Sequence, residues 1–291
     1  MSGLNRKFWD SDPIEKLRVG PGFRLAGVDP DATPGFDGVV KKNADEALAL
    51  GVGLLDALQE KLYANSRVSA ADGGGRKVLL VLQAMDTAGK GGIVRHVVGS
   101  VDPQGVRLTA FKAPTAEERA HDFLWRVRGR VPGPGLIGVF DRSHYEDVLI
   151  ARVHELAPAE DIEARYGQIR QFEQDLVDDG TTIVKVMLQI SSADQKERLL
   201  ERLDRPDKHW KYNPGDVDER MRWADYQSAY QLALERTSTP DAPWFVVPAG
   251  KKWYARLAVQ HLLIDALERL NLDWPPAAFD VAAEKARLAT S

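Results

Sequence analysis

A glycine-rich passage between a strand pattern and a helix pattern restricts the folds open to this chain. Residues 83–92 read QAMDTAGKGG, after an apolar run at 77–83 and before an apolar helical pattern at 93–101. Glycines let such a backbone curl so that successive N–H groups point inward, and the helix start adds partial positive charge. A lysine in this setting reaches the terminal phosphates of a ligand. The predicted phosphate-binding residues of this loop are Thr87, Ala88, Gly89, Lys90, Gly91 and Gly92.

Short apolar runs alternate with helical patterns along the rest of the chain. Runs that are continuously apolar are what strands covered on both faces require. We therefore expect an α/β fold with a doubly wound parallel sheet of about five strands flanked by helices. The predicted strands are residues 77–83, 106–111, 136–140, 182–190 and 244–248. The predicted helices are residues 93–101, 115–128, 159–178, 193–203, 216–236 and 251–270.

The sequence also predicts how the chain is divided. A segment rich in proline, glycine and aspartate precedes a helical pattern that starts near Asn43, a candidate N-cap, and ends at residues 70–75. We predict that residues 1–75 form an arm and a helix packed on the core, and that residues 76–291 form a single domain. A highly charged stretch at about 196–222 predicts a helical lid that projects from this domain.

Charge and cysteine content limit the expected partners. The 291 residues include 39 Lys and Arg against 43 Asp and Glu, for a formal net charge of -4. Neither nucleic acid nor a membrane is therefore an expected partner, and a polyanion must be bound by local basic clusters. The absence of cysteine excludes a disulfide framework, a thiolate metal site and a cysteine nucleophile. Together with apolar stretches no longer than a strand, it indicates a cytoplasmic protein.

Two positions in the glycine-rich passage depart from the usual phosphate-binding loop. Ala84 stands where a leading glycine is usual, and Gly91 stands where a Ser or Thr hydroxyl normally holds Mg²⁺. The metal must then be held by other groups, and Mg²⁺ prefers carboxylates, substrate phosphates and water. Asp86 in the loop and Asp141 at the end of the third predicted strand are the candidates, because strand ends meet at the ligand-binding edge of such sheets.

The residues directly after Asp141 add further candidates. Arg142 is suited to stabilise a transferring phosphate, and an ion pair that merely orients Asp141 is the alternative. Glu146 and Asp147 fit a ligand role and an exposed helix start, favoured by the helix dipole, about equally well.

A row of arginines in the charged stretch forms a candidate phosphate clamp. Arg198, Arg202 and Arg205 recur at i, i+4 and i+7, which places three guanidinium groups on one helix face, and Lys208 lies in the loop beyond. An exposed face paired with neighbouring acids is the alternative. The adjacent phosphate loop favours the clamp, because phosphoryl transfer requires charge neutralisation and exclusion of water.

The order and spacing of six segments between residues 77 and 270 resemble those of the polyphosphate kinase 2 family. These segments read QAMDTAGKGG, KAPTAEERAHDFLWR, GVFDRSHYEDVLIARV, RYGQIRQFEQDL, VMLQISSADQKERLLERLDRPDKHWK and WADYQSAYQLALERTSTPDAPWFVVPAGKKWYARL. The resemblance implies a fold like that of P-loop kinases. It implies that Asp86 and Asp141 hold Mg²⁺, with Mn²⁺ as a second candidate, and that Lys90 and Arg142 stabilise the transferring phosphate. It further implies nucleotide contacts by Asp122, Arg126, Tyr145 and Glu146.

The resemblance also implies an activity, namely reversible phosphoryl transfer from inorganic polyphosphate to nucleotides. The loop sequence and Glu146 are similar to those of the subgroup that accepts both mono- and diphosphates, so AMP and ADP are the expected acceptors and ADP and ATP the products. An ATP-dependent nucleoside monophosphate kinase is the enzyme alternative, and a polyanion-binding module without turnover is a third. A homo-oligomer, either dimer or tetramer, is the expected assembly.

Overall fold

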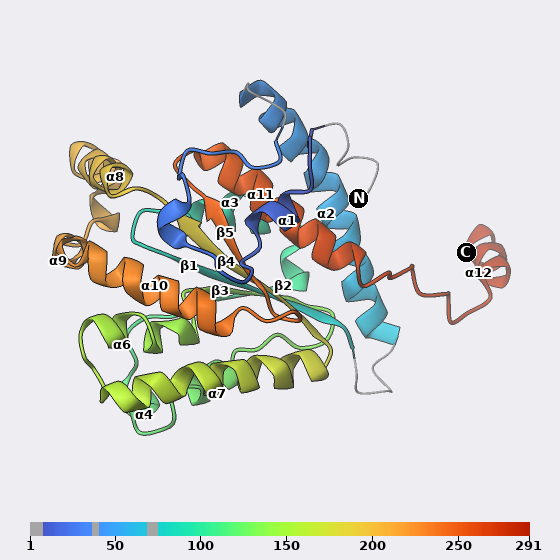
Figure 1. Cartoon of the computed structure of the whole chain (residues 1–291). Coiled ribbons are helices and arrows are strands. Elements are labelled where there is room, and N and C mark those ends of the chain that lie inside the picture. Colours follow the sequence, from blue (N-terminus) through green and yellow to red (C-terminus); the bar gives the residue numbers. More distant parts are fainter. Residues whose placement is uncertain (1–7, 37–40, 69–74) are drawn as a thin grey trace.

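A computed structural model describes residues 8–36, 41–68 and 75–291 of the chain. In this part of the chain, five parallel strands form one sheet in the order β2-β3-β1-β4-β5 (Figure 1). The predicted α/β class with a five-stranded parallel sheet is therefore confirmed. The strands are β1 (Lys77–Ala84), β2 (Val106–Ala110), β3 (Ile137–Asp141), β4 (Thr181–Gln189) and β5 (Trp244–Pro248).

Helices cover both faces of the sheet (Figure 1). One face packs against α1 (Pro13–Leu17), α2 (Lys41–Val68), α3 (Lys90–His96) and α11 (Lys252–Glu268). The opposite face packs against α6 (Ile150–Val153), α7 (Ala159–Asp178) and α10 (Trp223–Thr237). The other α-helices of the described residues are α4 (Ala116–Arg119), α5 (Trp125–Arg128), α8 (Ser192–Asp204), α9 (Gly215–Met221) and α12 (Val281–Ala289).

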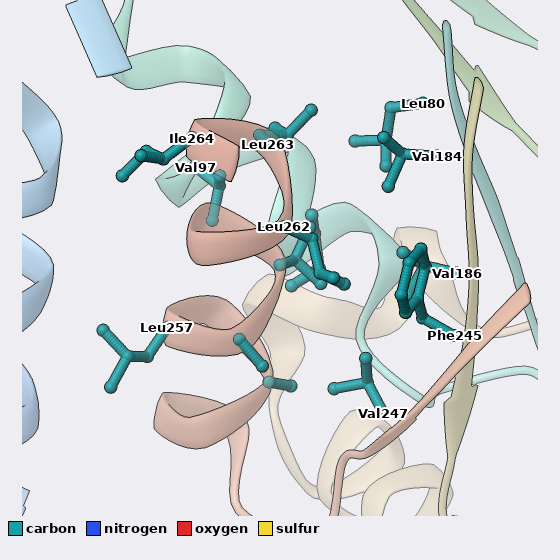
Figure 2. Close-up of a cluster of buried hydrophobic side chains, with 14 of the residues drawn as sticks. Leu80, Val97, Val184, Val186, Phe245, Val247, Leu257, Leu262, Leu263 and Ile264 are labelled. Carbon is teal, nitrogen blue, oxygen red and sulfur yellow. The ribbon is translucent and has the colours of Figure 1, made fainter. Parts of the chain in front are cut away.

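Burial on both faces explains why the strand sequences are continuously apolar. All eight residues of β1 are buried. Figure 2 shows how Leu262 of α11 projects toward Val186 of β4 and Phe245 of β5. Each such buried aliphatic or aromatic side chain contributes about 1.5–3 kcal/mol relative to exposure, so the sheet is a rigid base for the loops at its edge.

Three predicted helices differ from the structure, two by an interruption and one at its ends. The predicted helix 115–128 is two short helices, because Asp122 accepts a hydrogen bond from the backbone N–H of Leu124 and starts a new turn between α4 and α5. The predicted helix 216–236 is interrupted at Arg222, whose ψ of 23° ends α9 before α10 begins. The predicted helix 93–101 instead begins at Lys90 and ends at His96.

The N-terminal part packs along the sheet and its helices. The backbone N–H of Val19 donates to the carbonyl of Trp244 at 2.8 Å, so this segment protects the outer edge of β5. Helix α2 lies against α11 and begins at Lys41, so Asn43 is inside the helix and is not its N-cap, contrary to prediction. The predicted end of this helix is at residues 70–75, and residues 70–74 of that stretch lie outside the described residues. The division into 1–75 and 76–291 stays a prediction.

The C-terminal helix α12 lies apart from the sheet and its layers (Figure 1), and none of its residues is buried. Among the described residues, no helix combines the length and the apolar character that crossing a membrane requires.

Candidate phosphoryl-transfer site

The candidate site lies where β1 and β3 end side by side at the carboxyl edge of the sheet. Leu82 of β1 is in register with Asp141 of β3, so the loop after β1 and the turn after β3 leave the sheet at the same place. The backbone N–H of Arg142 donates to the carbonyl of Leu82 at 3.1 Å, which ties the turn to the strand that carries the loop. The parallel sheet thereby brings together two segments that are more than fifty residues apart.

The loop after β1 has the geometry of a phosphate cradle. Gly89 adopts a left-handed conformation with φ +119° and directly precedes α3, whose first residue is Lys90. A Cβ atom added to Gly89 or Gly91 would meet nothing within 4 Å, so the loop leaves open room for a ligand to approach the backbone. Lys90 Nζ donates to the carbonyl of Ala84 at 3.1 Å and thus lies over the loop. The loop geometry leaves the phosphate-binding role of the passage a prediction with open room for its ligand.

The acidic and basic groups of the site form a connected row. Arg142 Nη2 donates to Asp86 Oδ1 at 3.0 Å, and Arg142 Nη1 lies 4.0 Å from Glu146 Oε2. Burial lowers the pKa of Arg142, but the carboxylates of Glu146 and Asp86 outweigh it and raise the pKa above its usual value. Burial raises the pKa of Glu146, although Arg142 and Lys90 oppose that effect. Arg142 therefore stays cationic between two carboxylates, and its φ of +61° shows that the turn holds a conformation rare for a residue with a Cβ.

The carboxylates present fit a hard divalent cation. The Asp141 carboxylate makes no hydrogen bond or ion pair with any described residue, and Asp86 is only partly engaged, by Arg142. Mg²⁺ commonly takes one or two carboxylates and completes its shell with phosphate oxygens and water. Within the described residues, no group of three or more His, Cys, Asp or Glu side chains could hold a metal by protein ligands alone. The donor set is therefore suited to a metal that shares a phosphate substrate.

Two cavities meet at this row of charges. The first, of about 210 Å³, lies between the loop and residues of α9 and α10, and is lined by Asp86, Arg142, Glu146, Asp216, Glu219 and Tyr230. The second, of about 480 Å³, has a more apolar lining that includes Phe111, Pro114, Phe123, Arg126, Glu146 and Leu156. Arg142 and Glu146 line both cavities. The second cavity has the size and mixed lining of a small-molecule pocket, and it opens toward the charged row.

Comparison with known sequences decides the family. The family profile described as Polyphosphate kinase 2 matches residues 52–274. The chain belongs to the polyphosphate kinase 2 family. It is 47% identical over 274 residues to an AMP/ADP-polyphosphate phosphotransferase of Meiothermus ruber, covering 94% of this chain and 98% of the relative. It is 42% identical over 247 residues to an ADP-polyphosphate phosphotransferase of Rhodopseudomonas palustris, covering 81% and 83% of the two chains.

A solved structure of the polyphosphate kinase 2 family agrees with the fold. The crystal structure of polyphosphate kinase 2 from Arthrobacter aurescens is 60% identical in sequence and superposes with a TM-score of 0.94. The match covers 97% of this chain and 98% of that chain. The phosphotransferases of this family generally depend on a divalent metal, in agreement with the carboxylates at the sheet edge.

Of the predicted nucleotide-binding residues, two line the cavities and two do not. Arg126 lies over the Phe111 ring at 5.5 Å and donates to the carbonyl of Lys112, so it forms one wall of the larger cavity, whereas Glu146 lines both. Asp122 instead pairs with the exposed Arg128 at 3.0 Å and accepts from the backbone N–H of Leu124, so it starts the turn that leads into α5.

The prediction for Tyr145 is corrected by its burial. Its side chain is fully buried, and its hydroxyl donates to Glu173 Oε1 at 2.8 Å and also lies 2.9 Å from Thr237 Oγ1. Lys185 Nζ lies 3.0 Å from the same hydroxyl and 2.6 Å from Glu173 Oε2. The 3₁₀ turn η6 (His144–Asp147) sends Tyr145 into the core beneath the sheet edge while Glu146 lines the cavities. Tyr145 therefore supports the turn from below and lines neither cavity.

The predicted arginine clamp is not formed in the structure. Arg198 is buried and donates to four backbone carbonyls, whereas Arg202 pairs with Asp216 at 3.3 Å. Arg205 and Lys208 both pair with the exposed Asp207, at 2.9 and 3.3 Å. Spacing placed the three arginines on one helix face, but packing of α8 against the loop buries the first of them. Of the four predicted clamp residues, Arg202, Arg205 and Lys208 make no hydrogen bond with the backbone of the phosphate loop.

Sequence reasoning missed the side chains that the lid contributes. Asp216 and Glu219 of α9 line the smaller cavity together with Tyr226 and Tyr230 of α10. Glu219 Oε2 lies 2.8 Å from His154 Nε2 and also accepts from the Tyr226 hydroxyl, which holds α9 over α6. Asp216 and Glu219 lie between the fifth and sixth segments of the family resemblance, and Tyr226 and Tyr230 lie in the sixth without a pattern that marks a site. Their proximity to the loop arises only from the path of the chain after β4.

Proposed function

We propose that this chain transfers phosphoryl groups reversibly from inorganic polyphosphate to AMP and ADP, giving ADP and ATP. The observation that carries the proposal is the row formed by Asp86, Arg142 and Glu146, which joins the phosphate loop to both cavities. It is supported by the Meiothermus ruber relative, an AMP/ADP-polyphosphate phosphotransferase that is 47% identical over nearly the whole of both chains.

The roles of the site residues follow from charge and position. Phosphoryl transfer requires in-line placement and stabilisation of charge on the equatorial oxygens more than covalent chemistry. Lys90 and Arg142 supply the cations, and the loop amides supply hydrogen-bond donors. Asp86 and Asp141 would hold Mg²⁺, or Mn²⁺ in its place, which would neutralise charge on the phosphates. The lid cations Arg202, Arg205 and Lys208 would exchange their exposed partners for phosphate oxygens.

The larger cavity is the proposed nucleotide site. Its lining combines apolar walls from Phe111 and Phe123 with Arg126, a mixture suited to a nucleoside with a charged end. Because Glu146 and Arg142 line its boundary with the smaller cavity, the phosphate end of an acceptor would lie at that boundary. A polyphosphate donor carries no base, so it requires only cations around the loop.

An ATP-dependent nucleoside monophosphate kinase is the competing function, and it is not favoured. Such an enzyme normally keeps the loop hydroxyl that Gly91 lacks, and the similar curated proteins carry polyphosphate in their names. A dimeric or tetrameric assembly and a cytoplasmic location stay predictions from the sequence.

The deciding experiment is an anion-exchange time course with purified protein, Mg²⁺ and long-chain polyphosphate. AMP and ADP are supplied in separate reactions, and a third reaction contains AMP with ATP as the only donor. ADP followed by ATP from AMP is the expected result. ATP formed only from ADP would remove AMP from the acceptors, and transfer to AMP from ATP but not from polyphosphate would overturn the proposed donor.

A further inference from the structure

A buried arginine contacts the backbone of the phosphate loop. Arg198 of α8 is 9% exposed, and its Nη1 donates to the carbonyls of Thr87 and Ala88 at 3.2 and 3.3 Å. Its Nη2 donates to the carbonyls of Ala249 and Gly250, just after β5, at 2.7 and 2.9 Å. One guanidinium group thus joins the loop to the end of a strand on the far side of β4.

The phosphate loop creates a need for such a donor. When successive N–H groups point toward a ligand, the carbonyls of the same peptide units point away from it, into the protein. Buried carbonyls without a donor are destabilising, and Thr87 additionally holds a left-handed φ of +66°. The planar fork of Arg198 satisfies two adjacent carbonyls of the loop at once, and its charge polarises their peptide groups so that the N–H ends become better donors.

A second side chain of α8 extends the same contact by one residue. Gln195, which is 1% exposed and lies one turn before Arg198, donates through Nε2 to the carbonyl of Asp86 at 3.2 Å. Its Oε1 accepts from Arg220 of α9 at 3.2 Å. Three consecutive loop carbonyls, from residue 86 to residue 88, are therefore held by one face of α8, and α8 continues into the lid.

We propose that Arg198 is a positioning residue that fixes the backbone of residues 86–88 for phosphoryl transfer, and that it is not a ligand of the polyphosphate. The inference rests on the proposed role of the loop as the phosphate cradle. A lysine at this position keeps the positive charge but has a single ammonium group, which cannot hold four carbonyls in two directions. Loss of the guanidinium should therefore disturb turnover even where the charge is kept.

The test compares Arg198→Lys and Arg198→Met with wild type in the full chain. Arg170→Lys is the matched control, because Arg170 on α7 also donates to a backbone carbonyl, at 2.8 Å, but lies outside the site. The readouts are kcat, the KM for polyphosphate, the dependence of log(kcat/KM) on log salt, and the thermal midpoint. Assays run at a temperature where every variant is folded. The salt slope reports how many protein cations neutralise a bound polyanion.

A positioning role predicts that both Arg198 variants lose kcat by about 10- to 100-fold while the KM for polyphosphate and the salt slope stay within about twofold of wild type. The Arg170 control should keep all three values. The inference is overturned if Arg198→Lys keeps kcat while Arg198→Met raises the polyphosphate KM and flattens the salt slope, since that is the behaviour of a phosphate ligand. It is equally overturned if only the thermal midpoint falls.

Gln195→Met keeps the test decisive if the Arg198 variants do not fold. It removes the contact to the Asp86 carbonyl alone with little change of volume, and it should lower kcat by a smaller factor without raising the polyphosphate KM. An unchanged kcat would contradict the inference. Failure of the proposed function would look different, because wild type itself would then not use polyphosphate.

Discussion

The charges beneath the sheet edge and the charges of the lid are held in opposite ways. Beneath the edge, Lys185 and Glu173 are 0% and 2% exposed, lie 2.6 Å apart, and share further hydrogen bonds with Tyr145 and Thr237. In the lid, Arg205 and Asp207 are 49% and 60% exposed and pair at 2.9 Å. Both ion pairs are short, so the distance between the charged atoms does not distinguish the two regions.

Exposure to solvent distinguishes the two regions. An exposed pair contributes about 0–1 kcal/mol, because water screens it and two long side chains lose entropy. A buried pair is shielded from water and has no other partners within reach, so it holds one geometry. Losing one member of the pair leaves the other as an uncompensated buried charge. The turn that carries Arg142 and Glu146 therefore lies on a fixed base, whereas the exposed pair of Arg205 is loosely held, as the proposed exchange for phosphate oxygens requires.

The largest expected effect comes from a charge at the edge above the buried network. Asp141→Asn removes a proposed metal ligand while keeping its size, so kcat should fall by about 100- to 1000-fold with the thermal midpoint nearly unchanged. Steady-state kinetics and a thermal melt measure the two quantities. Asp178→Asn, on the exposed face of α7, is the control. Wild-type kcat in Asp141→Asn would refute the metal assignment.

Lys185→Met breaks the buried network itself. Glu173 is then left buried without its cation, and the free energy of unfolding should fall by about 3–5 kcal/mol. Urea unfolding followed by fluorescence measures the loss. The double variant Lys185→Met/Glu173→Leu removes both charges and should recover most of the stability. If the single variant lost less than about 1 kcal/mol, the contrast with the lid would fail.

Lowering the pH is a second test of the contrast between the buried network and the exposed pairs. Burial alone raises the pKa of Glu173, but Lys185 and His144 outweigh it, so the pKa lies below its usual value near 4.5. The stability contributed by this carboxylate is therefore fully present above about pH 4.5 and is lost as the pH falls through the lower folded-state pKa. Unfolding measured between pH 6 and pH 3 should show a steeper loss in wild type than in the double variant. Equal slopes would contradict the prediction.

The smallest expected effect is in the lid. Arg205→Ala removes an exposed pair and should leave the free energy of unfolding nearly unchanged. Because Arg205 is a proposed phosphate-binding cation, the polyphosphate KM should nevertheless rise, and more at low salt than at high salt. Urea unfolding and initial rates at two salt concentrations test both statements. A large loss of stability would mean that the lid pair is as constrained as the buried one.

Local pattern in the amino-acid sequence was enough to predict several parts of this protein. Continuous apolar runs mark strands covered on both faces, and all five appear in the sheet within a residue or so of their predicted ends. The glycine-rich passage and Asp141 were identifiable because loop glycines and strand-end acids have positional meaning in parallel sheets. Ala159–Asp178 was predictable to the residue, because one apolar stripe runs its whole length.

Tertiary structure decided what each side chain of these segments does. Arg198 and Arg205 have the same chemistry and lie on one helix, yet one is buried against loop carbonyls and the other pairs in water. Tyr145 and Glu146 are adjacent, yet one enters the core and the other lines the cavities. Spacing specifies which face of an element a residue occupies, but burial and partners depend on which distant segment packs on that face. That information arises only when the chain has folded.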